Sequence, residues 1–163
     1  YGISDFGLAR QLGISRKQAA SYIEAYFKRY PSIHDFMHSM VEKAKETGRA
    51  VTLFGRYREL PDINSKNFNR RSFAERTAMN TPIQGTAADI MKMAMIEVYR
   101  KMKEGGYKSR VLLQVHDELV AEVVKEEKEE IAALLKETME SVVKLKVPLV
   151  ADVNEGKNWA ETK

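Results

Sequence analysis

The stretch Leu113-Gln114-Val115-His116-Asp117-Glu118-Leu119-Val120 decides the fold of the second half of the chain. Two short apolar runs, 111–115 and 119–124, flank its polar triplet. Runs of this kind joined by a tight polar connection predict a β-hairpin. Because carboxylates are costly to bury beside apolar strands, we expect the acidic side chains to project from the hairpin tip. The triplet alone also fits an ordinary hairpin with a polar turn.

The carboxylate of Asp117 suits a metal site at this tip, because Mg²⁺ is a hard cation that prefers oxygen ligands. Two such ions can stabilise the attacking and leaving oxygens of an in-line phosphoryl transfer, which calls for carboxylates from at least two strands. A His-Asp metal phosphohydrolase is the competing interpretation, but its ligands come mostly from helices. His34 and His38 have the i, i+4 spacing of zinc ligands, although two polar residues on an exposed helix face explain them more simply.

The remaining sequence predicts mostly helices. Caps at Ser4 and at Ser15 with Gln18, and stops at Gly13, Pro31 and Gly48, predict three helices, the first to about residue 12 and the third over 32–47. A helical stretch over 68–104 contains Pro82 and Gly85, which predict a kink or two helices. An amphipathic helix is predicted over 126–143, and strands over 50–54, 57–60 and 148–153. The predicted fold class is therefore α/β (α+β), with helices packed on a small antiparallel sheet.

Composition sets wide limits. The chain has 163 residues, enough for one compact domain or two small ones, and it lacks any apolar run of the length of about 20 that a membrane span needs. The absence of cysteine excludes disulfides and thiolate metal sites and fits a reducing cytoplasm. A net charge of +4 permits nucleic-acid binding without demanding it, and Arg56 to Arg76 holds six basic residues against three acidic ones. Because the chain begins Tyr1-Gly2, we expect it to be cut from something longer.

Four separated segments resemble family A DNA polymerases, close to those of Bacillus-like bacteria. They are Tyr1-Gly2, which resembles the end of the family's fingers motif; Thr52-Leu53-Phe54-Gly55-Arg56; the run from Ala74-Glu75-Arg76 through Asn80-Thr81-Pro82-Ile83-Gln84-Gly85-Thr86-Ala87-Ala88-Asp89; and Leu113 to Leu119. The resemblance covers essentially the whole chain, in family order. It implies that residues 1–48 are the C-terminal part of the helical fingers and that 49–163 are part of the palm, including the catalytic hairpin.

The resemblance also implies roles for individual residues in a DNA-directed DNA polymerase. Asp117 would be the metal ligand and Glu118 its catalytic support, with two Mg²⁺ ions in the complete site. His116 would contact the primer near its 3′ end. Arg76, Asn80 and Gln84 of one helical stretch would contact the DNA or the nucleotide. Tyr1 at the start of the chain would do so as well.

These roles make physical sense, and each has a simpler alternative. A copying enzyme must accept every correct base pair, and the minor groove offers acceptors common to all pairs, which Gln and Asn amides can bind. A tyrosine face can stack on any base. Alternatively, Tyr1 is a frayed terminus, Asn80 caps a second helix before Pro82, Gln84 is a surface residue, and Arg76 pairs with a neighbouring acid.

The resemblance also predicts that half of the active site is missing. The family's other metal-binding aspartate, and the arginine and lysine that hold the triphosphate, have no counterpart here. The implied partners are primer–template DNA, deoxynucleoside triphosphates and the upstream half of the same polymerase, with no membrane, and the fragment alone should be inactive. Two alternatives stay open: the palm of a single-subunit RNA polymerase, and a non-catalytic DNA-binding fragment. Glu118 and the run Gln84 to Asp89 favour the DNA enzyme.

Overall fold

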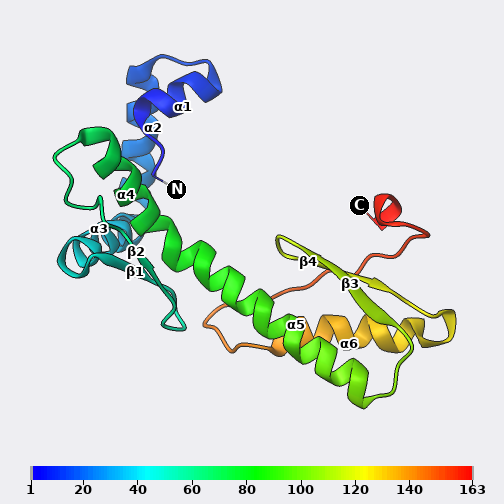
Figure 1. Ribbon diagram of the computed structural model, residues 1–163. Coiled ribbons are helices and arrows are strands. Elements are labelled where there is room, and N and C mark those ends of the chain that lie inside the picture. The colour runs from blue at the N-terminus through cyan, green and yellow to red at the C-terminus, as the bar shows by residue number, and fades with distance from the viewer. Residues whose placement is uncertain (1, 163) are drawn as a thin grey trace. The chain divides into compact units, whose positions relative to one another are not determined.

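The computed structural model describes residues 2–162 and divides the chain into two compact units, Tyr1–Thr86 and Ala87–Lys163 (Figure 1). We call them unit 1 and unit 2. The mixture of helices with small antiparallel sheets confirms the predicted fold class, although there are two separate two-stranded sheets where one was expected. The boundary between the units falls at Thr86, whereas the fingers and palm assignment, with its boundary at residue 48, stays a prediction.

Unit 1 opens with three helices whose ends follow the predicted caps: α1 (Asp5–Leu12), α2 (Arg16–Arg29) and α3 (Pro31–Thr47). Ser15 and Gln18 form the predicted capping box at the start of α2. Gly13 and Gly48 end α1 and α3 with positive φ angles of 66° and 71°, a conformation that glycine adopts without steric cost. The local signals therefore locate these helices correctly.

A small apolar core holds the rest of unit 1 together. Strand β2 (Tyr57–Glu59) is exposed and pairs antiparallel with β1 (Arg49–Val51). The core joins α3, β1 and helix α4 (Phe68–Asn80). Its buried members are Ala44, Ala50, Leu60, Ile63, Ala74 and Ala78, with Val41 packed against them. Both strands are shorter than predicted because the chain turns early: the Thr52 amide donates to the Arg56 carbonyl at 2.8 Å, and Gly55 has a φ of 83°.

The predicted interruption near Pro82 is present as a wider helical turn. Helix α4 passes into the π-helical segment η1 (Thr81–Gly85) and then into α5 (Thr86–Glu104) without leaving the helical path. Proline lacks an amide hydrogen and its ring clashes with the carbonyl four residues earlier, so an ordinary α-turn cannot continue there. A π turn accommodates this locally, and such turns are frequent at functional sites.

Unit 2 packs α5 and helix α6 (Lys128–Ser141) against the predicted hairpin, β3 (Arg110–Val115) and β4 (Glu118–Glu122) (Figure 1). The short helices η2 (Lys125–Glu127) and η3 (Trp159–Thr162) complete the unit. Val98, Met102 and Ile131 form the buried centre, with Val111 and Leu119 of the hairpin packed against it. Of the face predicted to point inward on α6, Ile131 and Thr138 are buried.

The predicted last strand over 148–153 is wrong, since this segment has no regular secondary structure. A strand exists only where a neighbouring edge accepts its backbone hydrogen bonds, and here the Ala151 amide donates to the Glu140 carboxylate at 3.0 Å instead. Val147 and Val150 are exposed. Over residues 2–162, no helix has the length and apolar character required to cross a membrane.

Candidate active site

The tip of the β3–β4 hairpin presents three predicted site residues side by side. Val115 pairs with Glu118, so the connection is a two-residue turn made by His116 and Asp117. His116, Asp117 and Glu118 are all exposed. The strands pack the partly buried Val111 and Leu119 against the unit 2 core while the acidic tip stays in solvent, as the sequence predicted.

The base of this hairpin is held by a carboxylate that the sequence analysis missed. Glu127 of η2 accepts from the amides of Lys108 and Ser109, each at 2.9 Å, and from the Ser109 hydroxyl at 2.6 Å. The Val124 amide donates to the same hydroxyl at 2.9 Å. These bonds tie the entry of β3 to the exit of β4. The hydrogen bond from the Lys108 amide, followed by those from Ser109, lowers the pKa of Glu127.

The donor atoms at the tip fit a hard cation in type. Asp117 supplies carboxylate oxygen from the turn and Glu118 from the first position of β4, and Mg²⁺ favours such oxygens in combination with water and phosphate. Over residues 2–162, no group of three or more His, Asp or Glu side chains is close enough to hold an ion. Asp117 and Glu118 are the two carboxylates that the hairpin tip itself presents.

Unit 1 presents a second group of predicted residues along α4 and η1. Arg76, Asn80 and Gln84 follow one another at intervals of four, close to one helical turn, and so share one side of the helical path. The buried Ala74 and Ala78 lie two positions earlier than Arg76 and Asn80, about 200° around the helix. The core contact of α4 therefore turns these polar side chains away from the interior.

The environment of these residues removes two of the simpler explanations. Asn80 has helical φ and ψ angles of −86° and −32° and makes no side-chain capping bond, so it does not cap a second helix. Glu75 lies 3.7 Å from Lys45, and within residues 2–162 the guanidinium of Arg76 meets only the Ser72 hydroxyl, at 3.4 Å. Arg76 is thus available for an external anion. Gln84 is exposed, as a surface residue would also be.

The turn after β1 docks beside Gln84. A Cβ atom on Gly85 would lie 2.6 Å from Thr52 Cγ2, and the Leu53 amide donates to the Thr86 hydroxyl at 2.9 Å. Two segments about 30 residues apart, each of which resembles a polymerase motif, are therefore in direct contact. The contact supports the π turn that carries Gln84.

The two units differ in net charge. Unit 1 has fourteen Arg and Lys against eight Asp and Glu, and unit 2 has thirteen against fifteen. Two of the three acidic residues between Arg56 and Arg76 form ion pairs with basic residues outside this segment: Glu59 with Arg49 at 3.0 Å and Glu75 with Lys45. Unit 1 as a whole carries a net positive charge, which suits phosphate binding of the kind that is independent of base sequence.

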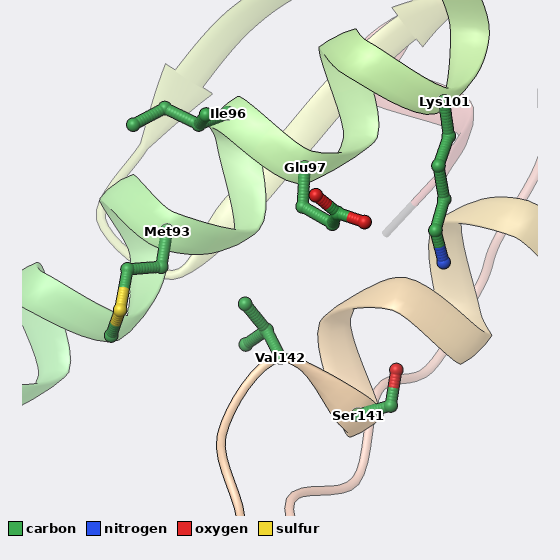
Figure 2. Close-up of a pocket in the computed structure, with 6 residues that line it drawn as sticks. All are labelled: Met93, Ile96, Glu97, Lys101, Ser141 and Val142. Atoms are coloured by element: carbon green, nitrogen blue, oxygen red, sulfur yellow. The ribbon is translucent and has the colours of Figure 1, made fainter. Parts of the chain in front are cut away.

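The pocket drawn in Figure 2 contains none of the predicted site residues. It lies on unit 2 between α5 and the end of α6, and its lining is Met93, Ile96, Glu97, Lys101, Ser141 and Val142. Lys101 donates to the Thr138 hydroxyl at 3.1 Å, so its ammonium already has an internal partner. Tyr1, the remaining predicted site residue, lies outside the described residues.

Comparison with known proteins gives the decisive observation: the family described as DNA polymerase family A matches residues 1–161. The chain belongs to DNA polymerase family A. It is 58% identical over its whole length to DNA polymerase I of Streptococcus pneumoniae and 53% identical to that of Geobacillus stearothermophilus, and it spans 19% of the length of each. The predicted resemblance, including its closeness to enzymes of Bacillus relatives such as that of Bacillus caldotenax at 54% identity, is confirmed.

A solved structure extends this family likeness to the fold. The POL domain of Pol1 from M. smegmatis, in complex with DNA primer-template and dNTP, matches 99% of this chain with a TM-score of 0.96 at 44% identity. The chain covers 29% of that structure's chain.

The sequence analysis missed two supporting arrangements: the hydrogen bonds between Glu127 and Ser109, and the close contact between Thr52 and Gly85. Their roles depend on contacts between elements, for which the sequence carries no periodic or capping signal. Only Gly85 carried a local signal, as a helix interruption, and that signal did not reveal the close contact with Thr52.

Proposed function

We propose that this chain is part of a DNA-directed DNA polymerase that adds deoxynucleotides to a primer 3′ end by two-metal phosphoryl transfer. The observation that carries the proposal is the match of nearly the whole chain, at a TM-score of 0.96, to a polymerase domain bound to primer–template DNA and dNTP. The exposed acidic tip of the hairpin supports it, because this chemistry requires carboxylates that reach the reacting phosphate.

Asp117 is the proposed metal ligand, with Glu118 beside it as catalytic support. Two bound Mg²⁺ ions would supply charge stabilisation for the attacking and leaving oxygens of the transfer. The turn keeps the Asp117 carboxylate in solvent, where substrate phosphates can complete the ligand set. His116 is the proposed contact to the primer near its 3′ end. The remaining metal ligands would come from the upstream half of the same polymerase.

Unit 1 would bind the DNA. Its excess of basic side chains suits the phosphate backbone, whose recognition does not depend on sequence. Gln84 and Asn80 are proposed to donate to minor-groove acceptors shared by all base pairs, with Arg76 close to the duplex and the incoming nucleotide. Tyr1 is proposed to stack at the templating position. In this proposal residues 1–48 belong to the fingers and 49–163 to the palm.

The lack of cysteine in the chain is compatible with work in a reducing cytoplasm, where we place the protein. We expect the 163-residue chain alone to be inactive, since within residues 2–162 no group of three or more His, Asp or Glu side chains is close enough to hold an ion.

The test is primer extension by the complete protein with Asp117→Ala, in saturating Mg²⁺, beside binding of the same primer–template. Asp152→Ala, which removes an exposed carboxylate outside the hairpin, is the matched control. We expect Asp117→Ala to abolish nucleotide addition while DNA binding survives, and Asp152→Ala to behave as the parent. Activity of Asp117→Ala within about tenfold of the parent, roughly 1.4 kcal/mol in the barrier, contradicts the metal-ligand role. A preference for ribonucleotides in the same assay would favour an RNA polymerase instead.

A further inference from the structure

The turn that carries Asp117 has an unusual backbone. His116 has a φ angle of 53°, and no other non-glycine residue in the described part of the chain has a positive φ. A side chain with a Cβ atom disfavours this left-handed region, which glycine and asparagine occupy far more readily. His116 is the first of the two turn residues between Val115 and Glu118, where hairpins with this turn normally place glycine. Something must therefore hold the turn in place.

The side chain of Gln114 supplies that restraint. Its Nε2 donates to the backbone carbonyl of His116 at 2.7 Å. This carbonyl belongs to the peptide unit that leads directly into Asp117. A hydrogen bond to it fixes the rotation of the peptide and so restricts the direction in which the Asp117 side chain leaves the backbone. Gln114 itself sits in regular strand pairing opposite Leu119, which makes it a firm point of attachment.

We propose that Gln114 is a positioning residue for the metal site: it holds the peptide between His116 and Asp117 in the left-handed turn and thereby aims the Asp117 carboxylate. The inference rests on the proposed polymerase function. Gln114 would then fix the conformation of the hairpin tip. In the sequence pattern this residue is only a polar position within a strand.

The role is separable from the stability of the hairpin. Gln114 is exposed, and the strands are anchored elsewhere by Val111 and Leu119 in the core and by Glu127 at the base. Removing the amide donor should leave the fold intact while the turn samples other conformations. One net hydrogen bond of ordinary strength corresponds to about fivefold to tenfold in the population of the restrained turn.

The experiment uses the complete protein with Gln114→Met, which keeps the length of the side chain and removes the donor. Gln11→Met makes the same chemical change at an exposed position of α1 and is the control. We expect Gln114→Met to lower kcat for single-nucleotide addition about fivefold to tenfold and to raise the Mg²⁺ concentration that gives half-maximal rate. The dNTP KM, the DNA Kd and the thermal midpoint should match those of Gln11→Met.

A second arm tests the turn directly with His116→Gly, alone and combined with Gln114→Met. Glycine adopts positive φ without steric cost, so the restraint should matter less in its presence. We expect the two substitutions together to cost less than the product of their separate effects. Independent, multiplicative effects would overturn the inference, as would a Gln114→Met protein with the Mg²⁺ dependence of the control, or one whose only change is a lower thermal midpoint.

The same assays distinguish a failure of the polymerase assignment from a failure of the role of Gln114. A parent protein that does not incorporate nucleotides, or an Asp117→Ala variant that stays active, refutes the polymerase assignment and this inference with it. An active parent and an inactive Asp117→Ala, together with a Gln114→Met protein equal to its control, refute the role of Gln114 alone.

Discussion

Substituting Gly85 by alanine should destabilise the chain, although alanine is the better helix former. The new Cβ would lie 2.6 Å from Thr52 Cγ2, where ordinary contacts lie at 3.4–4 Å. Thr52 is 7% exposed, and its hydroxyl accepts from the amides of Phe54 at 3.3 Å and Arg56 at 3.2 Å. Thr52 therefore cannot turn its methyl group away without losing these bonds. The turn after β1 or the π segment must shift instead.

The expected size follows from two opposing effects. Replacing glycine by alanine within a helix contributes about 1 kcal/mol of stability. Overpacking a filled site costs about 1–3 kcal/mol. We expect the clash to dominate and the free energy of unfolding to fall by about 1 kcal/mol or somewhat more. Thr52→Ser removes the methyl group and keeps the hydroxyl, at a cost of about 1 kcal/mol for one buried carbon.

The assay is equilibrium urea unfolding of the 163-residue chain followed by circular dichroism, on Gly85→Ala, Thr52→Ser and the double variant. The serine side chain leaves room for the new Cβ, so the double variant should be more stable than the sum of the single effects by about 1–2 kcal/mol. Additive effects within about 0.3–0.5 kcal/mol, or a Gly85→Ala chain as stable as the parent, would refute the contact as the reason for glycine.

Two further predictions concern Gln84 and Glu127. Gln84→Ala in the complete protein should slow primer extension most from mismatched or newly paired primer ends, with little change in dNTP KM. The reason is that the Gln84 amide is proposed to reach minor-groove atoms shared by all base pairs. Unchanged rates on matched and mismatched ends would contradict this. Glu127→Gln should destabilise the chain at neutral pH, and the difference in stability from the parent should shrink as the pH falls. The reason is that the pKa of Glu127 is lowered in the folded chain. Such a carboxyl stabilises the fold fully above its unfolded pKa of about 4.3, and this stabilisation is lost as the pH falls through the folded pKa. Urea unfolding at a series of pH values measures this, with Glu126→Gln as the control for the loss of one neighbouring carboxylate.

Local signals account for most of the helices and for the β3–β4 hairpin. Helix-capping signals act within one helical turn, so they can be recognised in the sequence without knowledge of the rest of the fold. Here they are the capping box of Ser15 and Gln18 and the left-handed glycines at 13 and 48. The apolar runs around His116-Asp117-Glu118 predict both the strands and the exposed acid because alternation and polarity are local properties. The family resemblance also followed from short segments, of which this hairpin is one.

The predictions that missed depended on neighbours. The segment 148–153 has the composition of a strand, but a strand needs an edge to pair with, and in this structure its Ala151 amide meets Glu140. The strand predicted over 50–54 ends at Val51 because Thr52 begins a turn that docks on Gly85. In each case the outcome was set by a contact with a residue distant in sequence.

The sequence by itself determined that an aspartate stands between two apolar strands and that a polar row lies along a helix near Pro82. Only the tertiary structure decided how these groups are held: by Gln114 on the carbonyl of His116, by Glu127 at the base of the hairpin, and by Thr52 against Gly85. The physical reason is that residue type and periodicity specify which groups prefer water or the core. The direction of a carboxylate depends instead on hydrogen bonds and close contacts that form only once the chain has folded.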